Sequence, residues 1–293
     1  MKKLMFAAAA IAAGVAVADV TYAYIVGYQN LGTSEGAGAV MNAIPFVTIT
    51  DATEEGYWLS DLKPQGYLNN KTLMKSGVAG QFAVQLLNEK GAAIATYKWA
   101  HSAGKSGWQD NARWVDPNNQ DVVAHQADSD YFFKMGTGLW CFAPAHNGDA
   151  TAIYSYNSAG QVCTNDVIWK LCSVAGAVAV ANPYPVAIKL SSLTPAGYLN
   201  NKTLMKSGVA GQFAVQLLNE KGGAIATYKW AHSAGKSGWQ DNARWVDPNN
   251  QDVVAGGEND LTIQPGQGLW VFAPAHNGDV GTDYTIEVKC PNF

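Results

Sequence analysis

An aromatic loop carries the side chains best suited to bind a ligand. It runs from Gly104 to Asn111 and places Trp108 between Gly and Ser residues on one side and amide and acid side chains on the other. An aromatic face can lie against the apolar C–H face of a sugar, while amides and carboxylates bind the sugar hydroxyls. The pattern therefore predicts a carbohydrate site. The alternative is that these tryptophans belong to a hydrophobic core.

The same loop occurs twice in the chain, so the predicted binding site is also duplicated. The candidate ligand-binding residues lie in each loop or just after it, and they are Trp108, Asp110, Asn111, Arg113, Trp114, Trp239, Asp241, Asn242, Arg244 and Trp245. Two sites on one chain gain avidity where a ligand spans both, as a polysaccharide does.

A short acidic loop follows each aromatic loop. Its oxygen-bearing side chains are ligands that a hard cation such as calcium prefers. The candidate calcium ligands are Asp116, Asn118, Asp121, Asp247, Asn249 and Asp252. The loop lacks the glycine and the glutamate that complete an EF-hand, and Asx turns that cap a strand explain the same residues without a metal. We therefore predict no cofactor, with calcium as the alternative.

No group of residues matches a catalytic motif. Four of the five histidines form two repeated pairs, His101 with His232 and His146 with His276, in turns rich in Gly, Ala and Ser. Neither a GxSxG elbow, an HExxH helix nor a Gly-rich phosphate loop accompanies them. The aspartates of the loops would suit a glycosidase only at a separation that a sequence does not give. We predict that the protein is not an enzyme.

Four cysteines can form two disulfides if the chain reaches an oxidising compartment. They are Cys141, Cys163, Cys172 and Cys290, and they allow three pairings. If each half of the chain closes on itself, Cys141 pairs with Cys163 and Cys172 pairs with Cys290. A zinc site is the rival interpretation, but no CxxC or His-rich spacing supports it.

The N-terminus has the pattern of a secretory signal peptide. Lys2 and Lys3 precede an apolar run from Leu4 to Val17, and small residues precede Asp19. We predict a signal peptide over residues 1–18 and export of the mature chain to the cell surface, the extracellular space or the periplasm. No later apolar run approaches the roughly 20 residues of a membrane-spanning helix, so no membrane span is expected.

The charge balance argues against a nucleic-acid partner. Without Lys2 and Lys3, 17 of the 19 basic residues remain against 23 acidic ones. Phosphate binding needs clustered Lys and Arg, which this chain lacks. Only 14% of the residues are charged while 48% are hydrophobic, which is the composition of a chain that folds.

A long block of sequence is present twice. Residues 66–124 return as residues 197–255 with one change, Ala92 to Gly223. A repeat of this length indicates tandem duplication of a whole domain, and we predict β-domains over residues 19–164 and 165–293. Because the flanks differ more than the block, a later exchange between the two copies explains the pattern better than one recent duplication.

Alternating apolar residues predict strands. Residues 81–87 alternate with period two, and residues 94–99 are rich in aromatic and β-branched side chains, so the two form a hairpin. Residues 139–143 and 269–273 are apolar on both faces, as in central strands. Residues 59–62 suit a short helical turn. The expected fold class is mainly all-β, with two tandem β-sandwich or open-barrel domains that arose by internal duplication.

Three short motifs carry a resemblance to a known group. They are the segments Ile25–Asn30, Tyr97–Trp99 and Pro265–Val271. In these motifs the chain resembles the secreted β-domain proteins of unknown function that abound in the Planctomycetes and Verrucomicrobia group of bacteria. The second half departs from the pattern, because Ile168–Cys172 stands in place of the opening motif. The resemblance implies export and a β fold, and it brings no catalytic residues with it.

These features predict an exported, non-enzymatic structural or adhesive protein of the cell surface or extracellular matrix. The unpaired strand edges of open β-domains suit self-association or contact with other surface proteins. The alternative is a bivalent carbohydrate-binding protein that uses Trp108 and Trp239.

Overall fold

A computed structural model shows that the chain is built almost entirely from β-strands. It contains no α-helix within the residues that it describes, so the predicted all-β class is confirmed. In that part of the chain, no helix is long and apolar enough to cross a membrane. The described residues are 26–32, 38–42, 44–47, 55–65, 82–88, 90–101, 112–143, 155–171, 176–196, 213–219, 222–232, 243–273 and 284–291.

Each half of the chain contributes ten described strands and one turn of 3-10 helix. The first half has β1 (Val26–Gly32), β2 (Gly38–Asn42), β3 (Gly56–Trp58), η1 (Leu59–Asp61), β4 (Lys63–Gln65), β5 (Phe82–Leu87), β6 (Ala93–His101), β7 (Ala112–Val115), β8 (Phe132–Lys134), β9 (Leu139–Ala143) and β10 (Ser155–Gln161). The second half has β11 (Val167–Lys170), β12 (Gly176–Ala181), β13 (Ile188–Lys189), η5 (Leu190–Ser192), β14 (Thr194–Ala196), β15 (Ala214–Leu218), β16 (Ala224–His232), β17 (Ala243–Val246), β18 (Thr262–Ile263), β19 (Gly268–Ala273) and β20 (Thr285–Val288).

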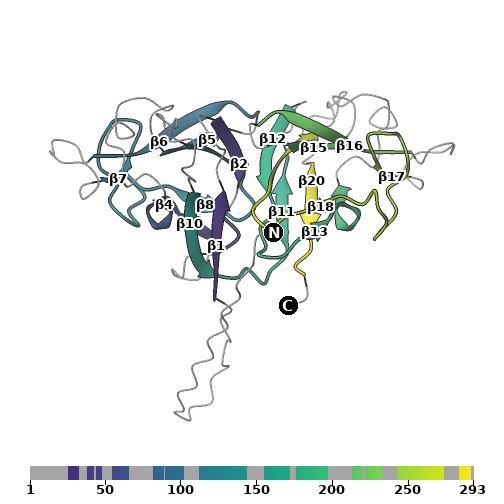
Figure 1. Ribbon diagram of the computed structural model, residues 1–293, viewed down its shortest axis with the longest axis horizontal. Helices are drawn as coiled ribbons and strands as arrows, with labels where there is room; N and C mark the ends of the chain where they lie inside the picture. The colour runs from purple at the N-terminus through teal and green to yellow at the C-terminus, as the bar shows by residue number, and fades with distance from the viewer. Residues whose placement is uncertain are drawn as a thin grey trace, which may run out of the picture.

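The strands of each half form one large antiparallel sheet and two small ones. In the first half the orders are β2-β9-β5-β6-β7, β1-β10-β4 and β3-β8. In the second half they are β12-β19-β15-β16-β17, β11-β20-β14 and β13-β18. The two halves therefore have the same strand order, and they form two lobes that lie side by side (Figure 1). The origin of this order by duplication and the domain boundary at residue 164 stay predictions.

The core of each half lies between its large sheet and its small sheets. In the first half, Phe82 and Val84 of β5 share a buried cluster with Tyr57 of β3 and Tyr156 of β10. The rings of Phe82 and Tyr156 meet edge to face at 5.3 Å between centroids. This packing of one sheet on others is that of a β-sandwich.

The predicted hairpin is confirmed in both its strands and its turn. β5 and β6 pair in antiparallel register from Phe82 opposite Trp99 to Leu87 opposite Ala93, with a bulge beside Leu87. Gly91 in the turn has a φ of 74°, a conformation that glycine adopts without steric cost. The alternation of apolar residues therefore predicts correctly that Phe82, Val84 and Leu86 of β5 face the core.

The two halves meet through contacts that occur in reciprocal pairs. Thr137 of the first half forms a β-bridge with Val180 of the second. Gln267, at the position in the second half that matches Thr137, forms a β-bridge with Asn42 of the first. Trp140 and Trp270 occupy matching positions in β9 and β19, and their rings lie 6.2 Å apart. Both halves therefore use the same surface for this contact, as the two subunits of an isologous interface do. The halves are joined as the subunits of a two-fold dimer are.

A side chain at Gly138 is expected to force the halves apart. A Cβ atom there would lie 2.8 Å from backbone atoms of Ala179 and Val180. We expect Gly138→Val to lower the free energy of unfolding by about 1–3 kcal/mol, measured by urea denaturation. Gly223→Ala is the matched control, because the atoms nearest to its Cβ would belong to the Asn219 side chain and the first copy already has alanine there. Equal stability of Gly138→Val and the wild type would contradict this contact.

Candidate functional site

Most of the predicted sugar-binding residues lie outside the part of the chain that the structure describes. These residues are Trp108, Asp110, Asn111, Trp239, Asp241 and Asn242. The carbohydrate site in the aromatic loops therefore stays a prediction. The other four residues of the predicted site belong to β7 and β17, where their surroundings are defined.

Trp114 and Trp245 are core residues, so the prediction that they extend a sugar platform is wrong. Each is 2% exposed. The indole nitrogen of Trp114 donates a hydrogen bond of 2.8 Å to the carbonyl oxygen of Leu62, and that of Trp245 donates one of 2.7 Å to Leu193. Trp114 also stacks on the ring of Tyr156. Neither indole has a face that a ligand can reach.

Arg113 and Arg244 lie at the surface and face the acidic loops. The Arg113 guanidinium is 3.7 Å from a carboxylate oxygen of Asp121, and the Arg244 guanidinium is 3.6 Å from Asp252. Both arginine side chains are 49% exposed, and exposed ion pairs contribute only about 0–1 kcal/mol to stability. Two of the predicted calcium ligands are thus already paired with a cation.

The acidic loop of each half is an Asx turn. Oδ1 of Asp116 accepts the backbone N–H groups of Asn118 and Gln120, both at 2.8 Å. Asp247 does the same in the second half with Asn249 and Gln251. These bonds engage the oxygens that a metal would need, and the structure shows no group of three or more His, Cys, Asp or Glu residues suited to a metal within the described ranges. Calcium binding here stays untested.

The acidic loop also covers the free side of the edge strand before it. The N–H of Val122 donates to the carbonyl oxygen of Trp114, and Val115 bridges Asp121. The second half repeats both contacts with Val253 and Asp252. Asp116 and Asp247 therefore have a structural role, since the turns that they close return the chain along β7 and β17.

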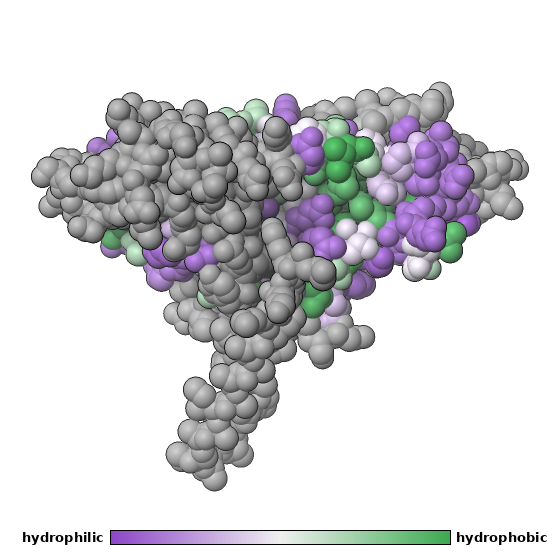
Figure 2. All heavy atoms as spheres, viewed as in Figure 1, coloured by the Kyte–Doolittle hydropathy of each residue, from purple (hydrophilic) through white to green (hydrophobic). Residues whose placement is uncertain are grey.

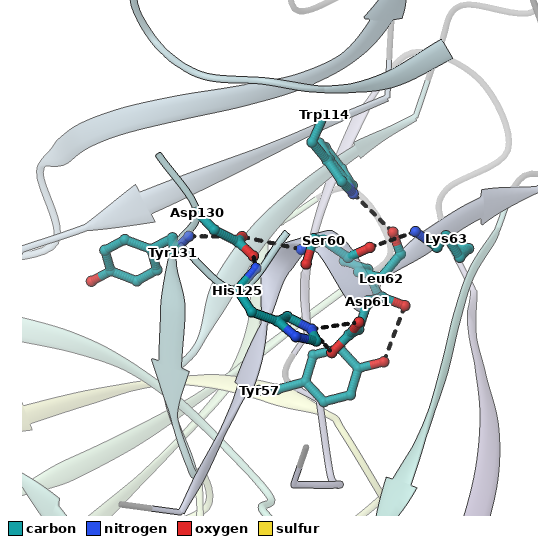
Figure 3. A network of polar contacts seen from close by, with 9 residues as sticks. All are labelled: Tyr57, Ser60, Asp61, Leu62, Lys63, Trp114, His125, Asp130 and Tyr131. Carbon is teal, nitrogen blue, oxygen red and sulfur yellow. Dashed lines mark hydrogen bonds and ion pairs between the residues drawn. The ribbon is translucent and has the colours of Figure 1, made fainter. Parts of the chain in front are cut away.

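A buried carboxylate organises the neighbouring loop in each half, and Figure 3 shows the one in the first half, Asp130. Asp130 is 4% exposed and accepts the backbone N–H groups of Ser60, Tyr131 and His125 at 2.9–3.2 Å. Its counterpart Asp260 accepts hydrogen bonds from Ser191 and from the backbone of Gly256. A buried carboxylate is costly unless it is hydrogen-bonded in this way. The two aspartates tie the 3-10 helices η1 and η5 to the loops beside them.

The first half has a cluster of three side chains, His125, Asp61 and Trp58, whose matching positions in the second half hold other residue types. Nε2 of His125 lies 3.1 Å from both carboxylate oxygens of Asp61 (Figure 3). The His125 ring is also 5.8 Å from that of Trp58. His125 has a φ of 59°, where the second half has Gly256 at 72°. A histidine in this region carries backbone strain of about 1–3 kcal/mol. The carboxylate fixes the orientation of the imidazole.

This histidine was not singled out from the sequence. The signal that could have found it is its replacement by glycine in the second half, while the acidic loop before it is unchanged. Asp61 precedes His125 by 64 residues, so only the fold brings the two together.

An open hollow lies beside β16 and the acidic loop of the second half. Its volume is about 360 Å³. It is lined by Ala224, Ile225, Ala226, Thr227, Lys229, Asp247, Pro248 and Asn250. The same residue types occur at the matching positions of the first half, within residues 93–98 and 116–119.

The predicted pairing of Cys141 with Cys163 is not formed. Cys141, Cys163 and Cys290 are all free thiols, and Cys172 lies outside the described residues. Cys141 is held in β9 between β2 and β5, where burial raises its pKa to about 12. Cys163 lies instead beside Glu55 and Cys290. The pairing by halves fails because the segment after β10 leaves the core of its own half.

Comparisons with known proteins give little guidance. No family model matches the chain, and no curated protein matches it either. A solved structure described as the infectious bursal disease virus VP2 subviral particle matches at 9% identity, over 95% of this chain and 75% of that chain. Its TM-score of 0.18 is too low to carry an argument.

The two interpretations of the acidic loop make opposite predictions about calcium. If Asp116 closes an Asx turn, Asp116→Ala loses two backbone hydrogen bonds, and we expect the free energy of unfolding to fall by about 1–3 kcal/mol. The loss should be the same in calcium and in a chelator, measured by thermal and urea denaturation. Asn118→Ala, which keeps the backbone donor, is the control. Calcium-dependent stability that Asp116→Ala removes would establish a metal site instead.

Proposed function

We propose that the protein is an exported, non-enzymatic structural or adhesive component of the cell surface or extracellular matrix that associates with its own copies. The observation that supports this proposal is the edge strand β1. Its seven residues pair with β10 along their whole length, and β1 stands at the end of its sheet among the described strands. An unpaired strand edge is a template for pairing with another chain.

The sequence of β1 lacks the features that protect an edge. Natural edge strands use charged residues, proline or short length to prevent pairing with other chains. β1 reads VGYQNLG and has neither a charge nor a proline. Its counterpart β11 has four residues, VIWK, and ends in Lys170.

The edges of the large sheets and the far edges of the three-stranded sheets are protected in the described parts of the chain. β4 and β14, at the far ends of the same small sheets, contain Pro64 and Pro195. β7 and β17 are covered by their acidic loops, and β2 and β12 lie at the junction between the halves. Among the described three-stranded and five-stranded sheets, the unprotected edge thus lies on one side of the first lobe. This favours a specific self-association over general aggregation.

Self-association is expected to depend on the edge of β1. We expect the mass of the predicted mature chain, residues 19–293, to rise with concentration in light scattering over a hundredfold range. Gln29→Lys with Asn30→Lys places charges on both faces of the strand. Repulsion between paired copies should then raise the concentration needed by about tenfold, which corresponds to about 1.4 kcal/mol.

The control adds the same charge away from the edge. Gln126 and Ala127 are exposed in the loop before Asp130, and replacing both with lysine should leave self-association unchanged. A mass that stays at one chain at every concentration would contradict the proposal, as would equal weakening by the two lysine pairs.

A bivalent carbohydrate-binding function is the second candidate. The observation that favours it is the hollow of about 360 Å³, which falls within the roughly 300–1,000 Å³ of small-molecule sites. It combines the apolar Ile225 and Pro248 with the polar Thr227 and Asn250. In the second lobe, hydrophobic residues gather on the side nearer the first lobe, and hydrophilic residues lie toward the outer side where β17 is found (Figure 2). Ile225 and its counterpart Ile94 are both 59% exposed, so both halves offer the same apolar side chain.

The sugar-binding candidate predicts a fluorescence response that depends on the aromatic loops. A soluble polysaccharide should shift the tryptophan fluorescence of the monomeric chain. Replacing Trp108 and Trp239 with alanine should abolish the shift and leave the denaturation curve unchanged. If the double variant fails to fold, these tryptophans are core residues and the aromatic loops do not support this candidate.

A further inference from the structure

Two cysteines from distant parts of the sequence lie together where the chain passes from the first half to the second. Cys163 follows β10, and Cys290 follows β20. The antiparallel pairing of β11 with β20 puts Val167 opposite Val288, so the segments just outside this pair run beside each other. The two cysteines are 127 residues apart in the sequence.

Several polar contacts hold the end of the chain against the connecting segment. The backbone N–H of Cys290 donates to a carboxylate oxygen of Asp166 at 2.8 Å, and the ammonium group of Lys289 lies 2.8 Å from the other oxygen. The Sγ of Cys290 is 3.9 Å from the carbonyl oxygen of Cys163. The two residues are therefore neighbours in space and not only in the pairing of their strands.

The two thiols differ in exposure and in their partners. The Cys163 residue is 1% exposed, and its Sγ–H donates to Oε2 of Glu55 at 2.9 Å. Cys290 is only partly buried. Burial, followed by the Glu55 hydrogen bond, raises the pKa of Cys163 to about 12. Burial, followed by the charge of Asp166, raises the pKa of Cys290. Both groups are therefore protonated thiols at neutral pH.

We propose that Cys163 and Cys290 form a disulfide when the chain meets a small-molecule disulfide such as oxidised glutathione. This pairing joins the connecting segment to the end of the closing strand, and it belongs to a different one of the three possible pairings from the one in which each half closes on itself. It goes beyond the proposed self-association and does not depend on it. A predicted exported chain would meet such an oxidant, because exported proteins pass through oxidising compartments.

The exchange proceeds in two steps. The thiolate of the more accessible Cys290 attacks the small disulfide, which releases one small thiolate and leaves a mixed disulfide. Cys163 then loses its proton to a base in solution, and its sulfur attacks the Cys290 sulfur of the mixed disulfide and displaces the second small thiolate. Two protein thiols and one small disulfide give one protein disulfide and two small thiols, so atoms and electrons balance.

Closing this link would stabilise the second half. All strands from β11 to β20 lie between the two cysteines, so the link restricts the whole of that half in the unfolded chain. Cross-links that close long loops remove much conformational entropy from the unfolded state. We expect the midpoint of thermal unfolding to be about 10 °C higher in the oxidised chain than in the reduced chain.

Peptide mapping of the full chain identifies the pair. Chymotrypsin cleaves after aromatic residues, so cleavage at Tyr156 and Trp169 separates Cys141, Cys163 and Cys172 from one another. After oxidation with glutathione disulfide and digestion without reductant, we expect one linked peptide pair, two hydrogens lighter than its parts, that contains Cys163 and Cys290. A link between any other two cysteines, or no loss of free thiols, would overturn the proposal.

Serine variants test the effect on stability, and each variant is compared only with its own reduced form, so the variants need not be equally stable. For each variant the difference in unfolding temperature between oxidised and reduced protein is measured. Cys290→Ser and Cys163→Ser should reduce this difference to zero, while the buried Cys141→Ser should keep it. A difference that persists in Cys290→Ser would overturn the pairing.

The rate of exchange gives an independent test. Because the pKa of each thiol is raised, the thiolate fraction is small at neutral pH, and the rate should rise about tenfold per pH unit below that pKa. Glu55→Gln removes a carboxylate that raises the pKa of both thiols, so it should speed the exchange and leave the linked peptide unchanged. A rate that does not vary with pH would show that these thiols do not carry the reaction.

Discussion

The indole nitrogens of Trp114 and Trp245 are donors that water cannot reach, and their hydrogen bonds fix how the layers of each half meet. Trp114 is on β7 of the large sheet, and its acceptor, the carbonyl of Leu62, lies beside β4 of a small sheet. Leaving such a donor unpaired costs about 1–3 kcal/mol. Tyr156 extends the same link, because its hydroxyl donates to backbone oxygens of Ala83 and Phe142. The sandwich is thus held by directional bonds as well as by apolar contact.

These bonds explain why the loops of both halves follow the same path. With β7 fixed by its tryptophan, the Asx turn returns the chain along the strand edge, and the buried Asp130 or Asp260 ties the following loop to η1 or η5. Backbone N–H groups donate to each carboxylate, and the Ser191 hydroxyl also donates to Asp260, so the place of each carboxylate depends mainly on the fold. Function is therefore to be sought in the side chains that these turns leave exposed and in the edges that they leave uncovered.

Local order was predictable from the sequence, and long-range contact was not. The alternation of apolar residues predicts β5 and β6, and the predicted helical turn over residues 59–62 corresponds to η1 and the residue after it. Interactions between residues close in sequence determine both kinds of element. Trp114 was placed in a binding site because a glycine-rich loop precedes it, and its acceptor is 52 residues away. The cysteine pairing failed for the same reason. Segments that are remote in sequence decide which thiols meet.

The repeated block, residues 66–124 and 197–255, covers a defined part of each large sheet. It contains β5, β6 and β7 in the first half and β15, β16 and β17 in the second, whereas β2, β9, β12 and β19 lie outside it. The latter strands carry the junction, where Gly138 is placed against Ala179 and Gly268 against the larger Met41. An exchange that overwrote these strands would mismatch the reciprocal contacts. An exchange of the outer strands would leave the contacts between the halves unchanged, provided that Gly91, where a Cβ would lie 2.9 Å from Trp270, stays glycine. The near-identical block thus coincides with the strands of each large sheet that lie away from the junction, and its origin by exchange stays a prediction.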